Sequence, residues 1–125
     1  MDNLNKRIVL VTGATGGLGT AMCKELHNDG FHVIANYRNK TKADEWKSKM
    51  KSEGYTIDMY EADVTDFDSV GAMIKKIEAE LGTVDTLVNN AGITRDGRFA
   101  KMTKEDWDAV ISSNLTSVFN CTRHV

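Results

Sequence analysis

Proline is absent from this sequence of 125 residues, and cysteine, aromatic residues and long apolar runs are scarce. The two cysteines, Cys23 and Cys121, stand far apart, and there is no CxxC pair or His/Cys cluster. We therefore expect reduced structural thiols and no metal site. No apolar run has the length of a membrane span, and residues 1–7 lack the apolar core of a signal peptide. These absences favour a cytoplasmic protein with no membrane partner.

An excess of charge of one sign is also missing. The chain has 16 Lys and Arg against 18 Asp and Glu, so its formal net charge is -2. That balance provides no basic surface for nucleic acid. Hydrophobic residues make up 41% and charged residues 27%, as in ordinary globular proteins. The length suits one domain around one core.

A glycine-rich turn follows the first apolar run. Residues 8–12 are apolar up to Thr12, the glycines 13, 17 and 19 follow in a G-x-x-x-G-x-G pattern, and a helical pattern begins at once. The N-terminus of a helix presents free backbone N–H groups, and glycines let a phosphate approach them. The pattern indicates a site for the pyrophosphate of a dinucleotide. A tight connection without a ligand is the alternative, and the flanking strand and helix make it the weaker one.

Apolar strands alternate with amphipathic helices along the rest of the chain. We expect strands at 8–12, 31–36, 56–60 and 84–89. We expect one helix at 17–28, one between a cap at Asn39 and Gly54, one between a cap at Asp66 or Asp68 and Gly82, and one from Thr103 onward. This alternation predicts an α/β fold with a three-layer, doubly wound parallel sheet in strand order 3-2-1-4. Ligands bind beyond the carboxyl ends of strands in such sheets.

The apolar residues of two helices lead to specific expectations. Leu18, Met22 and Leu26 recur every four residues, so we expect them to face the sheet. The last helix carries more apolar residues than one side of a four-stranded sheet can cover: Trp107, Val110, Ile111, Leu115, Val118 and Phe119. The strand at 84–89 has no lysine or proline to protect an edge. If the chain ends at Val125, we expect it to associate through the last helix, this edge, or both.

Several segments resemble the N-terminal half of the classical short-chain dehydrogenase/reductases. They are the turn Thr12–Gly19, the pair Asp63-Val64, the stretch Asn89–Gly92, and Asn114 in the last helix. The resemblance covers essentially the whole chain. It implies that residues 1–125 form the NADP-binding, Rossmann-type half of a single domain, truncated relative to the full fold of the family.

The resemblance also implies a set of site residues. The cofactor-binding positions of the family fall on Gly13, Thr15, Gly16, Gly17, Leu18, Gly19, Asn36, Tyr37, Arg38, Asp63, Val64, Asn90, Ala91, Gly92 and Ile93. Its catalytic asparagine falls on Asn114, and we expect Asp96 at the substrate. Without the resemblance, each of these residues has a structural interpretation. Arg38 would be a solvated charge and Asp63 a helix cap. Residues 90–92 would form a plain turn, and Asn114 would be a tolerated surface residue.

The end of the second strand favours NADP over NAD. An acidic residue there normally binds the ribose 2′-hydroxyl of NAD, and this position is Asn36. A carboxylate would repel a 2′-phosphate, whereas a neutral asparagine does not. Arg38 can pair with the phosphate through its guanidinium group.

The stretches 89–96, 101–103 and 106–111 look most like acetoacetyl-CoA reductases, with the 3-oxoacyl-[acyl carrier protein] reductases next. Both resemblances imply NADPH-dependent reduction of a 3-ketoacyl thioester, carried on CoA or acyl carrier protein, by a homo-oligomer that is a tetramer in the family. The acetoacetyl-CoA reductases convert acetoacetyl-CoA to 3-hydroxybutanoyl-CoA.

The catalytic tyrosine of the family precedes a lysine by four residues, and this chain has no such pair. Tyr37, Tyr55 and Tyr60 are followed at that spacing by threonine, methionine and valine. The resemblance therefore implies that the catalytic Ser, Tyr and Lys lie beyond Val125. A non-catalytic dinucleotide-binding module and a structural fragment that binds nothing are the alternatives.

Overall fold

The computed structural model describes residues 6–125. Residues 1–5 lie outside the described residues. They make up most of the segment 1–7, for which no signal peptide is expected. The elements are β1 (Ile8–Val11), α1 (Gly17–Asn28), β2 (His32–Tyr37), α2 (Lys40–Ser52), β3 (Asp58–Glu61), α3 (Phe67–Glu80), β4 (Thr86–Val88), the 3-10 turn η2 (Phe99–Lys101), α4 (Lys104–Ile111), the π-helical segment η3 (Ser112–Thr116) and α5 (Ser117–His124).

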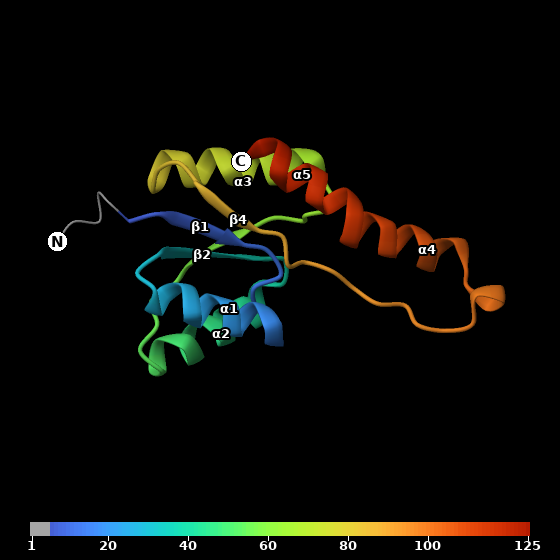
Figure 1. Cartoon of the computed structure of the whole chain (residues 1–125), viewed down its shortest axis with the longest axis horizontal. Coiled ribbons are helices and arrows are strands. Elements are labelled where there is room, and N and C mark those ends of the chain that lie inside the picture. The colour runs from blue at the N-terminus through green and yellow to red at the C-terminus, as the bar shows by residue number, and fades with distance from the viewer. Residues whose placement is uncertain (1–5) are drawn as a thin grey trace.

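The four strands form one parallel sheet in the order β3-β2-β1-β4, which confirms the expected topology. In the register, Leu10 of β1 lies opposite Ile34 of β2 and Leu87 of β4. Helices α1 and α2 cover one face of the sheet, and α3 and α5 cover the other (Figure 1). The apolar run Ile8–Val11 is buried at every position, as expected of a central strand covered on both faces.

Alternate residues of the strands supply the two halves of the core. Leu10 and Ile34 pack with the buried side chains of α3, such as Val70 and Ile77. Their neighbours pack on the other face with α1 and α2; this second cluster contains Val9, Val11, Val33, Ala35, Cys23, Trp46 and Met50. The period of two along each strand therefore divides the core between the two helical layers.

Helix α1 packs on the sheet through a different face from the expected one. Gly19 and Cys23 are its buried residues, whereas Leu18 is 69% exposed. Leu26 does pack against the core, and Met22 is half-buried. The reason is the close approach at Gly19, where a Cβ atom would lie 2.5 Å from the carbonyl oxygen of Gly13. Helix α1 therefore contacts the preceding turn through Gly19, and the periodicity of apolar residues does not indicate such a contact.

The strand boundaries differ slightly from the expected ones. Strand β3 begins at Asp58 rather than Thr56, and β4 is limited to Thr86–Val88. At the start of β3, the carboxylate of Asp58 lies 2.6 Å from Nε2 of His32 on the neighbouring strand. The expected helix caps are present at Asn39 and Thr103, and Asp66 is the cap of α3.

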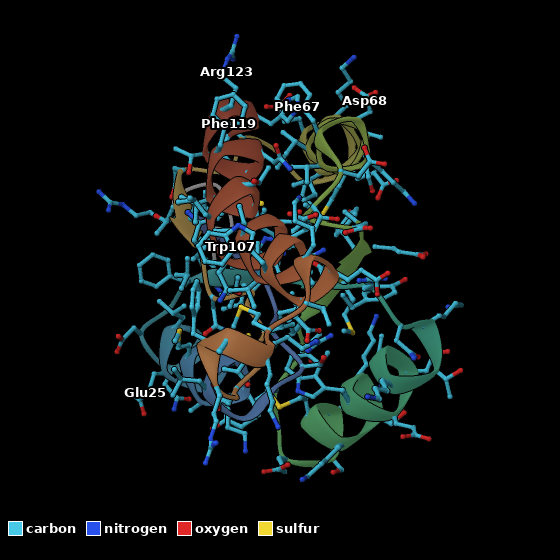
Figure 2. The ribbon with its side chains drawn as sticks, turned by 90° about the vertical axis from the view of Figure 1, so that its right-hand side faces the viewer. Glu25, Phe67, Asp68, Trp107, Phe119 and Arg123 are labelled. Atoms are coloured by element: carbon cyan, nitrogen blue, oxygen red, sulfur yellow. The ribbon has the colours of Figure 1, made fainter. Side chains whose placement is uncertain are left out.

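The last helical region runs from Lys104 to His124 with the π-helical segment in its middle. Helix α5 packs on α3, and Phe67 and Phe119 stack with their ring centroids 5.9 Å apart (Figure 2). Helix α4 projects past the end of the sheet at the far side of a long loop (Figure 1). Large apolar side chains are exposed along this helical region: Trp107 on α4, Leu115 in η3, and Val118 and Phe119 on α5. Within residues 6–125, no helix combines the length and the apolar character needed to cross a membrane.

Candidate functional site

A cavity of about 450 Å³ lies where the loops after the four strands meet. Its walls come from all of the expected cofactor-binding segments. From these segments it is lined by Gly13, Thr15, Gly16, Asn36, Tyr37, Arg38, Asp63, Val64, Ala91, Gly92 and Ile93. The fold thus brings together residues that the sequence separates by up to eighty positions, because parallel strands end at one edge of the sheet.

The glycine-rich turn forms the floor of this cavity at the start of α1. Gly13 has φ +58°, and a Cβ atom on it would lie 2.8 Å from the Cα atom of Ala91. Only glycine satisfies both conditions. Gly16 is the N-cap of α1 and offers no side chain, so the first N–H groups of the helix have no side-chain acceptor. In front of Gly17 there is open space, since a Cβ atom there would meet nothing within 4 Å. This arrangement fits an anion such as a pyrophosphate.

Thr12 joins the glycine-rich turn to the loop after β4. Its buried hydroxyl oxygen accepts hydrogen bonds from the N–H groups of Asn90 and Ala91, each at 3.0 Å. The side-chain amide of Asn90 donates to the carbonyl oxygen of Gly13 at 3.0 Å. These contacts hold the two loops against each other. Thr12 belongs to the glycine-rich motif of the sequence, although it is not among the expected site residues.

Asn36 lines the cavity, and its side-chain amide also connects two strands. Its side chain is 3% exposed, and its amide nitrogen donates to the carbonyl oxygens of Ala62 at 3.2 Å and Tyr60 at 3.4 Å. The residue therefore ties β2 to β3 and to the segment that follows it. The side chains that reach the open part of the cavity from β2 are the half-buried Tyr37 and the exposed Arg38.

Hydrogen bonds stabilise the charged form of the Asp63 carboxylate. Its Oδ1 atom accepts from the hydroxyl of Thr65 at 2.6 Å and from the N–H of the same residue at 3.0 Å. The Thr65 hydroxyl is the main cause that lowers the pKa of Asp63; the N–H group and the charge of Arg38 add to it, and partial burial opposes it. Asp63 therefore remains ionised across the neutral range.

Asn114 lies in the π-helical segment and binds the loop after β4. Its Oδ1 atom accepts from the N–H of Ile93 at 2.7 Å, and its Nδ2 atom donates to the carbonyl oxygen of the same residue at 2.9 Å. A Cβ atom on Gly92 would lie 2.9 Å from this Oδ1 atom. π-Helical turns inside α-helices occur often at functional sites. The sequence placed Asn114 in a regular helix and did not indicate the π-helical turn.

A second, more open cavity of about 620 Å³ adjoins the first and shares Gly92 and Ile93 with it. Its remaining walls are Asn90, Thr94, Arg95 and Asn114. The structure thus places Asn90 and Asn114 here rather than in the first cavity. Asp96 is exposed and lines neither cavity, and Gly17, Leu18 and Gly19 lie at the start of α1 without lining either.

Sequence reasoning missed five residues that line the first cavity: Asn39, Lys42, Ala62, Thr65 and Ser113. Their positions next to Arg38, Asp63 and Asn114 were the available signal.

The two cysteines are free and buried; burial raises the pKa of Cys23 to about 12 and that of Cys121 to about 11, so neither is a nucleophile at neutral pH. Across residues 6–125, no three His, Cys, Asp or Glu side chains gather as metal ligands would.

The sheet order, the glycine-rich turn after β1 and the cavity across the strand ends define a doubly wound α/β protein of the Rossmann type. The family model for short chain dehydrogenases matches residues 7–125. The chain therefore belongs to the short-chain dehydrogenase family.

Two curated relatives show how the chain compares with named proteins. Nodulation protein G from Azospirillum brasilense is 54% identical over 98% of this chain and 50% of its own length. An acetoacetyl-CoA reductase from Cupriavidus necator is 47% identical over the same shares of the two chains. The chain thus spans about half the length of the curated relatives it matches.

Among solved structures, the chain is similar to an F189W variant of actinorhodin polyketide ketoreductase with NADPH. The TM-score is 0.92 at 31% sequence identity, over 99% of this chain and 48% of that one. The likeness covers all four strands and the helices between them, because nearly the whole chain is matched.

Proposed function

We propose that this chain is the NADP-binding half of an NADPH-dependent reductase of 3-ketoacyl thioesters, of the acetoacetyl-CoA reductase type. The observation that carries the proposal is the cavity that unites the glycine-rich turn, Arg38, Asp63 and residues 91–93 at one end of the sheet. The similarity to an acetoacetyl-CoA reductase supports the substrate class. In this proposal, residues 1–125 and the remainder of the protein form a single domain.

Each part of the cavity has a role in holding NADP. The turn at residues 13–19 binds the pyrophosphate through its N–H groups, and Asp63 with Val64 holds the adenine. Tyr37 and Arg38 receive the 2′-phosphate, and residues 90–93 pass beneath the ribose of the nicotinamide. The bound NADPH supplies the hydride. The open space in front of Gly17 and the uncapped first turn of α1 fit this arrangement.

The charges around Arg38 support NADP rather than NAD. Within residues 6–125, no carboxylate forms a salt bridge with Arg38, so its guanidinium group is available to a phosphate. No acidic residue follows β2 directly; Tyr37 and Arg38 stand where the strand ends. The amide of Asn36 supports this end of the cavity from inside, through the main chain of β3 and Ala62.

The second cavity is the proposed place of the acyl thioester. Asn114 stands beside Ile93 at its wall and is the proposed catalytic residue within this chain. Asp96 follows on the same loop, where an extended substrate would pass. The chain holds no tyrosine four residues before a lysine, so the proposed proton donor belongs to the remainder of the parent protein.

The proposed parent protein is a cytoplasmic homo-oligomer. The exposed apolar side chains of η3 and α5 form the proposed contact with another subunit, among them Leu115 and Phe119. Burying such residues between subunits removes apolar surface from water.

Two alternatives differ in substrate and in class. The segments 89–96, 101–103 and 106–111 also resemble 3-oxoacyl-[acyl carrier protein] reductases, which makes reduction on acyl carrier protein the second candidate. A dinucleotide-binding module without catalysis is the third.

The test follows NADPH oxidation by the full-length protein with acetoacetyl-CoA and, separately, with acetoacetyl-[acyl carrier protein]. We expect faster turnover with the CoA ester and none from a polypeptide of residues 1–125, which has no positioned acid. Preference for the carrier protein would support the second candidate. NADPH binding without turnover on either ester would support the module, and turnover by residues 1–125 would require a different proton donor.

A further inference from the structure

A chain of hydrogen bonds runs from the interior of α2 to the glycine-rich turn. The indole Nε1–H of Trp46 donates to the hydroxyl oxygen of Thr20 at 2.8 Å. That hydroxyl donates in turn to the carbonyl oxygen of Gly16 at 2.6 Å. Trp46 is 8% exposed and packs in the apolar cluster between the sheet and helices α1 and α2. The turn is thus connected to a rigid part of the core.

The hydrogen bond to the carbonyl of Gly16 also affects the N–H of Gly17, which lies in the same peptide plane. The carbonyl of Gly16 and the N–H of Gly17 belong to one planar peptide group, so orienting the first orients the second. Gly16 is an N-cap without a side chain, and glycine has more backbone freedom than any other residue. Its carbonyl oxygen accepts from both the hydroxyl and the backbone N–H of Thr20, the latter at 2.9 Å. The hydroxyl therefore adds a second hydrogen bond that restrains the carbonyl of Gly16, beside the backbone one.

We propose that Trp46 is a positioning residue for the cofactor: through Thr20 it holds the Gly16–Gly17 peptide so that the N–H of Gly17 faces the pyrophosphate. The inference rests on the proposed function, because it requires NADP in the cavity. Trp46 itself is absent from the cavity lining and acts only through the hydroxyl. Neither Trp46 nor Thr20 belongs to the site residues that the sequence suggested.

The first experiment compares two ligands on the full-length protein by titration. NADP⁺ uses the glycine-rich turn, whereas adenosine 2′-monophosphate carries no pyrophosphate and reaches only the Arg38 end. We expect Trp46→Phe to weaken NADP⁺ about two- to tenfold, the range for one net hydrogen bond. Its affinity for adenosine 2′-monophosphate should stay within about twofold. Trp107→Phe is the matched control, because Trp107 is 49% exposed on α4 and should change neither affinity.

The second experiment changes the hydroxyl itself and keeps the indole. Thr20→Val removes the relay and should weaken NADP⁺ at least as much as Trp46→Phe, while Thr20→Ser keeps the hydroxyl and should restore most of the affinity. The double variant Trp46→Phe/Thr20→Val should be no weaker than Thr20→Val, because the indole acts through the hydroxyl. Thermal unfolding of each variant checks that it is folded. If Trp46→Phe does not fold, Thr20→Val still tests the proposal.

The outcomes separate the inference from the proposed function. A wild-type protein that binds neither ligand would overturn the proposed function. A wild-type protein that binds both, with Trp46→Phe and Thr20→Val unchanged toward NADP⁺, would overturn the inference alone. Equal losses for both ligands would also overturn it, since they would indicate a general structural role. Selective loss of NADP⁺ affinity with rescue by Thr20→Ser supports it.

Discussion

At the scale of single residues, the cavity has two ends that recognise different parts of a ligand. Arg38 stands at one end beside Tyr37, and the glycine-rich turn lies at the other. Asp63 also lines this cavity, and its pKa is lowered. Since these groups sit at different parts of one proposed ligand, substitutions at each should produce different signatures.

Arg38→Ala should weaken NADPH by about 1–3 kcal/mol, the range for hydrogen bonds to charged groups, and leave NADH nearly unchanged. The reason is that only NADPH carries the 2′-phosphate that the guanidinium group would pair with. Titration of both cofactors against the full-length protein measures the difference. Arg7→Ala is the control, because Arg7 is exposed at the opposite end of β1. Equal losses for the two cofactors would show that Arg38 does not recognise the phosphate.

Gly17→Val should abolish cofactor binding while the protein stays folded. A side chain on Gly17 would meet no protein atom within 4 Å, so the fold can accept it. In the proposed complex it would stand between the pyrophosphate and the N–H groups at the start of α1. Gly19→Ala, by contrast, should destabilise the fold. Its Cβ atom would lie 2.5 Å from the carbonyl oxygen of Gly13, so the free energy of unfolding should fall. Cofactor titration and chemical denaturation of both variants test the pair. Survival of binding within about tenfold in Gly17→Val would mean that the glycine serves only the chain geometry.

Thr65→Val should raise the pKa of Asp63 toward its ordinary value, because the Thr65 hydroxyl is the largest cause of its lowering. In the native protein a lowered carboxyl pKa stabilises the fold above the pKa of the unfolded chain. That contribution is lost as the pH falls through the folded-state pKa. An NMR titration of the Asp63 carboxyl carbon in both proteins measures the change. An unchanged midpoint in Thr65→Val would contradict the assignment of the cause.

At the scale of elements, the π-helical segment sets the relation between the last helix and the loop after β4. Asn114 makes both of its hydrogen bonds to the main chain of Ile93, so the helix and the loop are fastened at one residue. The helix continues on both sides as α4 and α5. The two cavities share Ile93 in their walls, so this contact shapes both.

Asn114→Ala should lower the free energy of unfolding by about 1 kcal/mol, a modest value because the side chain is exposed. It should also speed amide hydrogen exchange at Ile93, whose N–H would lose its acceptor. Denaturation and exchange measured by NMR test both parts. Asn28→Ala, at the exposed end of α1, is the control and should change stability by less than about 0.5 kcal/mol. Unchanged exchange at Ile93 would contradict the proposed link.

At the scale of the whole molecule, two surfaces of residues 6–125 are poorly suited to water. Leu115 is 64% and Phe119 is 60% exposed on the last helical region. Strand β4 pairs with β1 alone within the described residues, which leaves its other edge with unpaired backbone groups. Exposed apolar patches and open strand edges both promote association.

A polypeptide of residues 1–125 should therefore associate in solution, and Leu115→Glu/Phe119→Glu should shift it toward the monomer. A charge at these positions would have to be desolvated in any apolar contact. Sedimentation over a range of concentrations measures the effect. Leu18→Glu is the control, because Leu18 is equally exposed but lies on α1 in the other helical layer. Sedimentation of the unmodified polypeptide as a monomer at high concentration would contradict the prediction.

Local periodicity and chain order were enough to predict the architecture and to bring the main segments of the candidate site to one edge of the sheet. The alternation of apolar strands and amphipathic helices led to the order β3-β2-β1-β4, since parallel strands with helical crossovers permit few arrangements. The glycine-rich turn, Arg38 and Asp63 could be placed at one edge because each follows a strand. These features depend on local periodicity and chain order, which a sequence contains.

Where individual side chains point, and which layer covers them, could not be predicted from the sequence. The amide of Asn36 turns to the carbonyl oxygens of Tyr60 and Ala62, α1 rests on Gly19 rather than Leu18, and Trp46 reaches Thr20. Each depends on groups brought together from distant parts of the chain. Packing and hydrogen bonding of buried groups select these contacts, and neither has a period that a single segment displays.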